Sequence, residues 1–390
     1  MNQPILTAEP TIASLAVARI LKASRRPSSL GTVDSGSIAL SMGEPDAGTP
    51  RPVVDAGIEA LKQGRTRYTA LTGLPKLRKA LAAKLSVQAA RAIKPEQVVV
   101  THGGSAGLAA AVIAMVNAGD RVVIPEPTYS LYGDHVAMVG GEAVWVPNSP
   151  NGSLDLERLE HEAATARMII LCNPSNPTGL VYSAEELVSL AHILERHPNV
   201  LLLADEAYAD IVFDGVPFLS ALQLHSIADQ VIYCSTFSKS YAMTGWRLGF
   251  VVASPERSAA INLVHRSING SINTFVQDAA LVALQTPEAD LAQLRASYQR
   301  RRDVVVEHLQ SAPRVNLLPP EGAFYAFPKI DCDLTSDEMT QRFARNGVVV
   351  RSGSEFGPSG EGHVRISFAA DVDSLNEGMR RFVETVRSFG

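Results

Sequence analysis

Residues 97–125 read QVVVTHGGSAGLAAAVIAMVNAGDRVVIP, and this stretch decides the fold class. The run QVVVT (97–101) is rich in β-branched residues and predicts a buried strand, and the GGSAG segment after it predicts a loop. LAAAVIAMVNA predicts a helix that ends at Gly119, and RVVIP (121–125) predicts the next strand. Strand, helix and strand in this order form a βαβ unit, the building block of a parallel sheet covered by helices.

The same alternation extends on both sides of this unit, from about residue 50 to about residue 255. Two amphipathic helices are expected before it, one behind Pro52 and one across residues 74–85. Another helix is expected from about Ser183, because Glu186 three residues later completes a capping box. Five further apolar runs predict strands: EAVWV (142–146), RMIILC (167–172), VLLLAD (200–205), VIYC (231–234) and RLGFVVA (247–253). The expected fold is therefore α/β with a mostly parallel sheet.

The length of 390 residues exceeds the roughly 250–300 residues at which a single core stops growing. After about residue 290 the pattern changes to a charged helical stretch, a strand-like AFYAF, a helix around 336–346, the alternating HVRISFA and a terminal helix. We therefore expect a large domain over residues 51–290 and a small domain over residues 291–390. Residues 1–50 are expected to pack with the small domain.

Hydrophobic residues make up 46% of the chain, and 35 Lys and Arg against 40 Asp and Glu leave a net charge of −5. Because no block of five or six like charges occurs, we expect no nucleic-acid and no membrane partner. No stretch reaches the ~18 apolar residues of a membrane span, and the N-terminus lacks a signal-peptide pattern. The three cysteines lie far apart, so we expect reduced thiols, no metal site and a cytoplasmic protein.

In an open α/β sheet the ligand lies beyond the carboxyl ends of the strands, so the residues after each apolar run should meet. Gly103 and Gly104 can offer backbone amides to a phosphate at the positive end of a helix dipole. Further donors for the same anion are Ser105, Thr236, Ser238 and Arg247. Two alternatives stay open for the loop: a dinucleotide site with Glu126, about 20 residues on, as its ribose-binding acid, or a plain tight turn.

Three charged residues are candidates for chemistry. Asp205 ends the apolar run LLLAD, where a carboxylate needs a cation or donors, or where it caps the following turn. Lys239 lies among Ser, Thr and small residues, where a lysine can be desolvated and become a Schiff-base nucleophile, although a single lysine usually faces solvent. Arg365 lies opposite the apolar face of HVRISFA, where it binds a carboxylate bidentately or simply faces solvent.

Three motifs resemble those of a known family: NPSNPTG (173–179), DEAYADIVF (205–213) and STFSKSYAMTGWRLGF (235–250). In this order and spacing they resemble the class I/II aminotransferases of fold type I, which use pyridoxal 5′-phosphate. The resemblance covers most of the chain, from SMGEPDAGTP (41–50) to HVRISFA (363–369). It implies a seven-stranded, mostly parallel sheet sandwiched by helices in the large, cofactor-binding domain, and a smaller α+β domain from the two chain ends.

The resemblance also implies roles for individual residues. Lys239 would form a Schiff base with the cofactor aldehyde and act as the general base. Asp205 would pair with the pyridine nitrogen, while Tyr208 and Asn176 would hydrogen-bond the phenolic oxygen and Tyr129 would lie against the ring. The phosphate would be held by Gly103, Gly104, Ser105, Thr236, Ser238 and Arg247.

The implied activity is the transfer of an amino group between an L-amino acid and a 2-oxo acid. Arg365 would bind the substrate α-carboxylate, and Gly43 and Asn176 would also approach the substrate. Tyr68 would reach the phosphate of the other subunit, which implies a homodimer with shared active sites.

Other reactions stay open at this point. The closest is a β-eliminating C–S lyase on the same scaffold, followed by the NAD-type dehydrogenase that GGSAG suggests, and a regulator with an aminotransferase-like domain ranks last. The chain departs from the family at Arg351-Ser352-Gly353, where many relatives have Pro-Gly, and residues 269–280 supply no arginine for a dicarboxylate. Arg266 is near but is expected on a surface helix. The motifs do not identify the amino donor or the oxo acid acceptor.

Overall fold

The structure, a computed structural model, describes residues 14–26 and 36–389. Its centre is a seven-stranded sheet with the strand order β2-β8-β7-β6-β5-β3-β4. Neighbouring strands run parallel except at β8, which is antiparallel to both β2 and β7. The strands are β2 (Val98–Thr101), β3 (Arg121–Glu126), β4 (Glu142–Pro147), β5 (Ala166–Cys172), β6 (Leu201–Asp205), β7 (Val231–Thr236) and β8 (Gly249–Val252). Each overlaps one of the predicted apolar runs, so the predicted mostly parallel sheet is confirmed.

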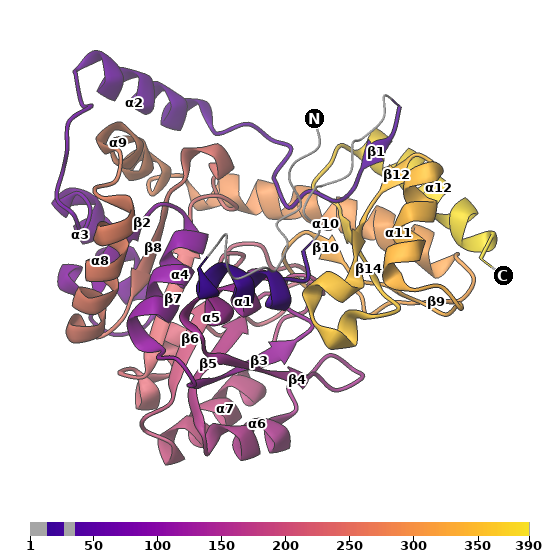
Figure 1. Cartoon of the computed structure of the whole chain (residues 1–390). Coiled ribbons are helices and arrows are strands. Elements are labelled where there is room, and N and C mark those ends of the chain that lie inside the picture. Colours follow the sequence, from indigo (N-terminus) through magenta and orange to yellow (C-terminus); the bar gives the residue numbers. More distant parts are fainter. Residues whose placement is uncertain (1–13, 27–35, 390) are drawn as a thin grey trace.

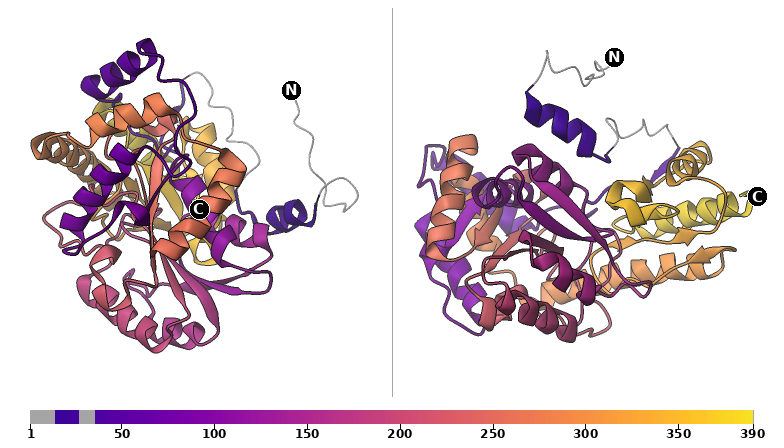
Figure 2. Two further views of the ribbon diagram at one scale, coloured as in Figure 1. Left: turned by 90° about the vertical axis from the view of Figure 1, so that its left-hand side faces the viewer. Right: turned by 60° about the horizontal axis from the view of Figure 1, so that its bottom comes forward.

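Helices cover both faces of this sheet (Figures 1 and 2). Successive strand residues point to opposite faces: Leu202 packs in the core under α3, α6, α7 and α9, and Leu203 in the core under α4, α5 and α8. Burial on both faces explains why the strands are continuous apolar runs. The helices are α2 (Arg51–Lys62), α3 (Pro75–Gln88), α4 (Gly104–Met115), α5 (Leu131–Val139), α6 (Leu156–Ala163), α7 (Ala184–Arg196), α8 (Pro255–Asn269) and α9 (Thr274–Ala283).

Helix α4 of the first βαβ unit differs from the prediction at both ends. Gly103 has a positive φ of 81°, so the chain turns at once and the helix begins at Gly104, inside the segment predicted as a loop. The helix ends at Met115 rather than Gly119, because Val116 already has extended backbone. The early start places the glycine-rich segment in the first turn of a helix, with its amides at the strand ends.

A second group of elements lies to one side of the sheet around its own apolar core (Figure 1). Its strands β10, β14 and β13 form an antiparallel sheet, and β1 pairs in parallel with β12. Helix α1 (Leu15–Ala23) instead packs on α5. The predicted domain limits remain a prediction. The elements of this group are β1 (Ile38–Ala39), α10 (Glu288–Gln310), β9 (Val315–Asn316), β10 (Tyr325–Ala326), β11 (Lys329–Ile330), α11 (Ser336–Arg345), β12 (Val348–Val349), β13 (Arg351–Ser352), β14 (Val364–Ser367) and α12 (Val372–Arg387).

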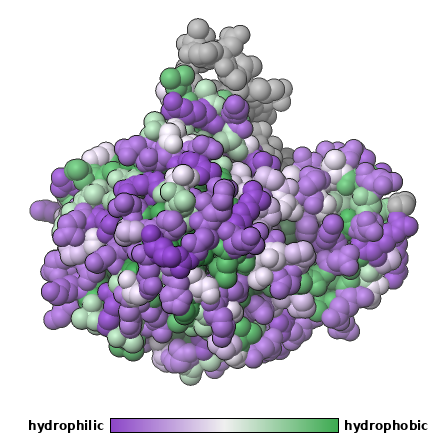
Figure 3. All heavy atoms as spheres, turned by 90° about the horizontal axis from the view of Figure 1, so that it is seen from below, coloured by the Kyte–Doolittle hydropathy of each residue, from purple (hydrophilic) through white to green (hydrophobic). Residues whose placement is uncertain are grey.

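The surface shown in Figure 3 is mostly hydrophilic, with hydrophobic residues in small scattered groups. Within residues 14–26 and 36–389, no helix combines the length and the apolar character that crossing a bilayer requires. The three cysteines are free, and two of them, Cys172 and Cys234, are buried. Cys172 lies in β5 and Cys234 in β7, where each takes the place of a small apolar residue, as the sequence predicts for these two.

Candidate active site

The carboxyl ends of the sheet strands border a cavity of about 450 Å³. Residues of β10, β13 and β14 and of the segment 41–44 form its other walls. The predicted site residues that line it are Gly43, Gly104, Ser105, Tyr129, Asn176, Asp205, Tyr208, Thr236, Ser238, Lys239, Arg247 and Arg365. The structure therefore brings nearly all predicted site residues into one space, although they come from positions spread over more than 300 residues of sequence.

Lys239 follows β7 and lines this cavity. Its Nζ donates a hydrogen bond to the carbonyl oxygen of Gly43 at 2.5 Å. The pKa of Lys239 is lowered to about 8, mainly by burial and then by the positive charge of Arg365, against the opposing charges of Glu44 and Asp205. Near neutral pH part of the Lys239 population therefore carries a neutral amine, which is the form that attacks a carbonyl or accepts a proton.

Asp205 ends β6 inside the protein and has two hydrogen-bond donors. Its Oδ2 accepts from the hydroxyl of Tyr132 at 2.8 Å, and its Oδ1 accepts from the N–H of Ala207 at 3.2 Å. Burial raises the pKa of Asp205, and these two hydrogen bonds oppose the shift. The two sequence alternatives for Asp205 are both realised, because the carboxylate caps the next turn and also borders the cavity.

Arg365 is only 6% exposed, so the solvent-facing alternative is wrong. Its Nη1 donates to Oδ1 of Asn176 at 3.0 Å, and its Nη2 donates to the carbonyl oxygen of Ser41 at 2.7 Å. The guanidinium carbon lies 4.4 Å from the ring centroid of Tyr325 and 4.9 Å from that of Phe356. Its Nε is buried and finds no acceptor among the described residues. The Arg365 guanidinium is thus packed between two rings and keeps N–H donors that the described residues do not use, which suits it to binding a carboxylate.

Several residues of the site are absent from the sequence prediction, among them Ser41, Tyr132, Tyr325 and Phe356. The hydroxyl of Tyr325 lies 2.8 Å from that of Tyr208, and burial raises the pKa of Tyr325 to about 12. Tyr132 and Tyr325 had usable signals, the first in the PTYSLY segment after a strand and the second in the EGAFYAF motif. Ser41 contacts Arg365 through its backbone carbonyl and Phe356 contacts it through its ring, and no local sequence pattern predicts either contact.

The N-terminus of α4 and Arg247 form a cradle for an anion. A Cβ atom on Gly103 would lie 2.8 Å from Nη2 of Arg247, so glycine keeps the space beside the guanidinium open. Nη1 of Arg247 donates to the carbonyl oxygen of Thr244 at 2.8 Å. Hydroxyl groups border the same part of the cavity in Ser105, Thr236 and Ser238. Backbone amides at a helix start, hydroxyls and a guanidinium are the donor set that suits a phosphate.

Glu126 does not line this cavity. It is 1% exposed, and its Oε2 accepts a hydrogen bond from the N–H of Ser359 at 3.1 Å. The carboxylate that a dinucleotide site would need for the ribose is therefore turned away from the glycine loop, and the dinucleotide alternative loses its acid.

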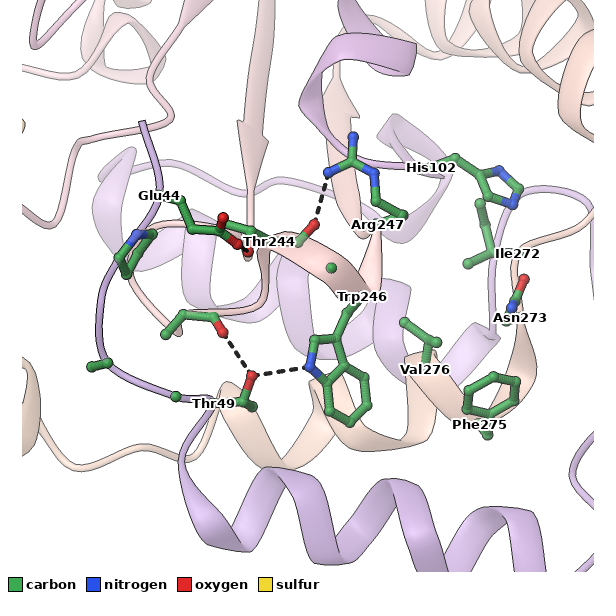
Figure 4. Close-up of a pocket in the computed structure, with 15 residues that line it drawn as sticks. Glu44, Thr49, His102, Thr244, Trp246, Arg247, Ile272, Asn273, Phe275 and Val276 are labelled. Carbon is green, nitrogen blue, oxygen red and sulfur yellow. Dashed lines mark hydrogen bonds between the residues drawn. The ribbon is translucent and has the colours of Figure 1, made fainter. Parts of the chain in front are cut away.

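A second cavity of about 630 Å³ adjoins the first at Arg247, which lines both. Figure 4 shows that Trp246 lies along this cavity, where its Nε1 donates to Oγ1 of Thr49 at 3.0 Å. Tyr68 lines neither cavity of its own chain and is 98% exposed. Part of the segment 269–280 borders the second cavity, with side chains that carry no positive charge: Ile272, Asn273, Phe275 and Val276.

Arg351 lines the first cavity beside Arg365, its antiparallel partner on β14. Its Nε donates to Oε2 of Glu355 at 2.9 Å, and its Nη2 contacts the same oxygen. Both partners are largely buried. Arg266, by contrast, is exposed on α8 and lines neither cavity, in line with the surface position expected for it. The departure from the family pattern at residues 351–353 therefore adds a paired cation to the cavity wall.

Comparisons with known proteins agree on one family. A family model described as aminotransferase class I and II matches residues 35–385. The chain is 34% identical to an aspartate/prephenate aminotransferase of Cereibacter sphaeroides over 95% of this chain and 96% of that protein. It is 35% identical to an arginine–pyruvate transaminase of Pseudomonas aeruginosa over 90% and 91% of the two chains. A solved aromatic aminotransferase of Pyrococcus horikoshii superposes with a TM-score of 0.87 at 33% identity, over 90% of this chain and 96% of that one. These relatives carry aminotransferase names, so the lyase alternative is not favoured.

Proposed function

The chain belongs to the aminotransferase class I and II family and is a transaminase, and we propose that it carries pyridoxal 5′-phosphate as a Schiff base on Lys239. One observation carries the proposal. A lysine amine whose pKa falls to about 8 shares one cavity with a buried carboxylate and an anion cradle. The amine can react with the aldehyde of the cofactor, the carboxylate can pair with its pyridine nitrogen, and the cradle can bind its phosphate.

The described residues fit this cofactor by chemistry and by space. The unfilled space at Gly103 and the donors around Arg247 suit its phosphate. Asp205, whose two donors favour the charged carboxylate, suits a protonated ring nitrogen, and a hydrogen bond of this charge-assisted kind contributes roughly 1.5–3 kcal/mol. Tyr208 and Asn176 would hold the phenolic oxygen, and Tyr129 would lie against the ring.

The chain's own residues then divide the reaction among them. Arg365 binds the α-carboxylate of the substrate and orients its Cα, and Gly43 lies beside the lysine amine. When bound, the cofactor draws electrons away from the substrate Cα. Nζ of Lys239, as the neutral amine, accepts the Cα proton and later returns it, a role worth ~10²–10⁴ in rate for a well-placed base.

Chemical trapping tests the cofactor and its anchor. Purified protein should be yellow, should lose the colour on borohydride reduction, and should then carry a permanent mass increase on the peptide that contains Lys239. Lys84, whose amine hydrogen-bonds Tyr241, serves as the internal control and should stay unmodified. Colourless protein, or label on Lys84 instead, contradicts the proposal.

The reaction is tested with a panel of amino acids, each paired with a 2-oxo acid. Transamination consumes one amino acid for each new amino acid formed. Release of ammonia and pyruvate without a second amino acid would show a lyase instead. The same panel identifies the amino donor, since the relatives carry names that refer to different amino acids.

We further propose a homodimer in which Tyr68 of one subunit enters the site of the other. The proposal is supported by the exposure of Tyr68 and by the wide cavity beside Arg247, which no residue of the segment around Tyr68 fills in its own chain (Figure 4). Mixing Lys239→Ala with Tyr68→Ala protein tests it, because a mixed dimer contains one site with both residues intact. Restored activity on mixing is expected, whereas a monomer in sedimentation or no restoration contradicts shared sites. A cytoplasmic location, which the free cysteines support, remains part of the proposal.

A further inference from the structure

Glu126 is a buried carboxylate that has no part in the mechanism above. It ends β3, and its side chain lies under a turn that is 233 residues away in sequence. Burial raises the pKa of Glu126, and hydrogen bonding to Ser359 opposes the shift. Burying a carboxylate costs free energy. We therefore expect the hydrogen bond between Glu126 and Ser359 to contribute to the structure of a neighbouring part of the protein.

The turn over Glu126 fits the carboxylate closely. Gly357 has a φ of 125°, and a Cβ atom built on it would lie 1.9 Å from Oε2 of Glu126. The carboxylate thus occupies the space that any other side chain at position 357 would need. On the other side of the glycine, the N–H of Thr128 donates to the carbonyl oxygen of Phe356 at 2.8 Å. Two hydrogen bonds, one on each side of Gly357, therefore hold residues 356–359 against the end of β3.

Phe356 links this turn to the cavity. Its ring is buried, lines the cavity and lies 4.9 Å from the guanidinium carbon of Arg365. On its other side it packs edge-on against Phe327, with the centroids 5.9 Å apart. Asn176 and Ser41 hold Arg365 along one edge, while Phe356 and the opposing ring fix its plane. A shift of the turn would free Arg365 to tilt.

We propose that Glu126 is a positioning residue for the substrate carboxylate. By accepting the N–H of Ser359 it holds Phe356 against Arg365, and so keeps the guanidinium in one plane. This inference rests on the proposed function, because Arg365 must be the group that binds the carboxylate. What the turn requires is an acceptor oxygen at a fixed reach, so the length of the side chain matters more than its charge.

A pair of variants separates reach from charge. Glu126→Asp withdraws the oxygen by one methylene, whereas Glu126→Gln keeps an acceptor oxygen at the original reach. In the holoenzyme, the Asp variant should raise KM for the amino donor and the Kd of butanoate, measured by calorimetry, by about tenfold, with kcat within about threefold. The Gln variant should stay within about threefold of wild type in KM, in the Kd of butanoate and in kcat. Glu142→Gln, at an exposed glutamate that begins the neighbouring β4, is the matched control and should change nothing.

Each outcome decides the matter. An Asp variant with unchanged butanoate Kd overturns the inference, and so does a Gln variant that is as impaired as Asp. A role in stability alone would lower the unfolding midpoint of the Asp variant and leave its butanoate Kd untouched. If the Asp variant does not fold, Gly357→Ala, which presses on the same oxygen, must raise the Kd instead. Wild-type protein without transaminase activity would refute the proposed function, which is a separate result.

Discussion

Replacing Tyr132 by Phe removes a single hydroxyl and measures how strongly that hydroxyl favours the ionised form of Asp205. Tyr132 is fully buried on α5, and its hydroxyl lies 2.8 Å from Oδ2 of Asp205. A hydrogen bond to a charged acceptor contributes roughly 1.5–3 kcal/mol, whereas one to a neutral acceptor contributes about 1 kcal/mol. Among the described residues, only the N–H of Ala207 still donates to the Asp205 carboxylate after the substitution. The variant should therefore lose about 1.5–3 kcal/mol of folding free energy where Asp205 is ionised and about 1 kcal/mol where it is protonated.

The pH dependence of this loss follows from the direction of the pKa shift. Burial already raises the pKa of Asp205 above its ordinary 3.8, and losing the Tyr132 hydroxyl raises it further. A carboxyl with a raised folded-state pKa favours the folded protein at low pH, and that advantage is lost as pH rises through the folded pKa. Because the pKa is higher in the variant, its stability keeps falling over a pH range in which that of wild type has levelled off. The gap between the two proteins should therefore widen with pH.

The assay is urea unfolding of cofactor-free protein at about pH 5 and about pH 9, at one protein concentration. Tyr182→Phe is the matched control, because Tyr182 is also a buried tyrosine but accepts its hydrogen bond from Nδ2 of Asn148, which does not titrate. The control should lose about 1 kcal/mol at both pH values. If Tyr132→Phe shows the same loss at both pH values, or no loss, the hydroxyl does not support the charge on Asp205 and the reasoning is refuted.

Three further changes have defined outcomes. Lys239→Ala should keep the fold and lose turnover almost completely, and assay of the purified variant with a working donor checks this. Lys239→Met should stabilise the cofactor-free protein by about 3 kcal/mol near neutral pH, because the pKa of Lys239 is lowered, mainly by burial, from 10.5 to about 8, which makes its ammonium form costly in the folded state. Urea unfolding should show that this gain vanishes above about pH 10.5, where the lysine is neutral in both states. Arg351→Ala should cost about 3–5 kcal/mol because it leaves Glu355 buried and unpaired, and adding Glu355→Ala should recover part of that loss.

The strands and some helix starts of this fold can be predicted from sequence, because their signals lie within a few neighbouring residues. The strands are visible as apolar runs because burial on both faces leaves few polar positions in them, and these lie at or near the strand ends. The start of α7 is visible because Ser183 and Glu186 each satisfy an amide of the other, so the signal lies within four residues. The rule that ligands lie beyond the strand ends is equally local, and it gathers Asp205 and Lys239 correctly.

The rest of the site depends on contacts that no local pattern encodes. Tyr132 reaches Asp205 across 73 residues, and the carbonyl of Ser41 reaches Arg365 across 324. Glu126 shows that sequence spacing can mislead. It follows the glycine loop at the sequence spacing expected of a ribose-binding acid, but its position at the end of β3 places it under the turn that contains Ser359. Side-chain direction at a strand end is set by tertiary packing, so it becomes known only with the structure.

The pKa shifts in the cavity give the strongest physical link between this site and its ligands. Burial raises the pKa of Asp205 and lowers those of Lys239 and Arg365, so in all three cases it opposes the charged form. Each pKa unit corresponds to about 1.4 kcal/mol of cost to the charged form, which a ligand of opposite charge offsets on binding. Under the proposed function, a protonated ring nitrogen would do this for Asp205 and a carboxylate for Arg365, while Lys239 would gain by reacting as a neutral amine. Substrate and cofactor should therefore raise the stability of the protein as they bind. A net charge of −5 describes the whole chain and says nothing of this local arrangement.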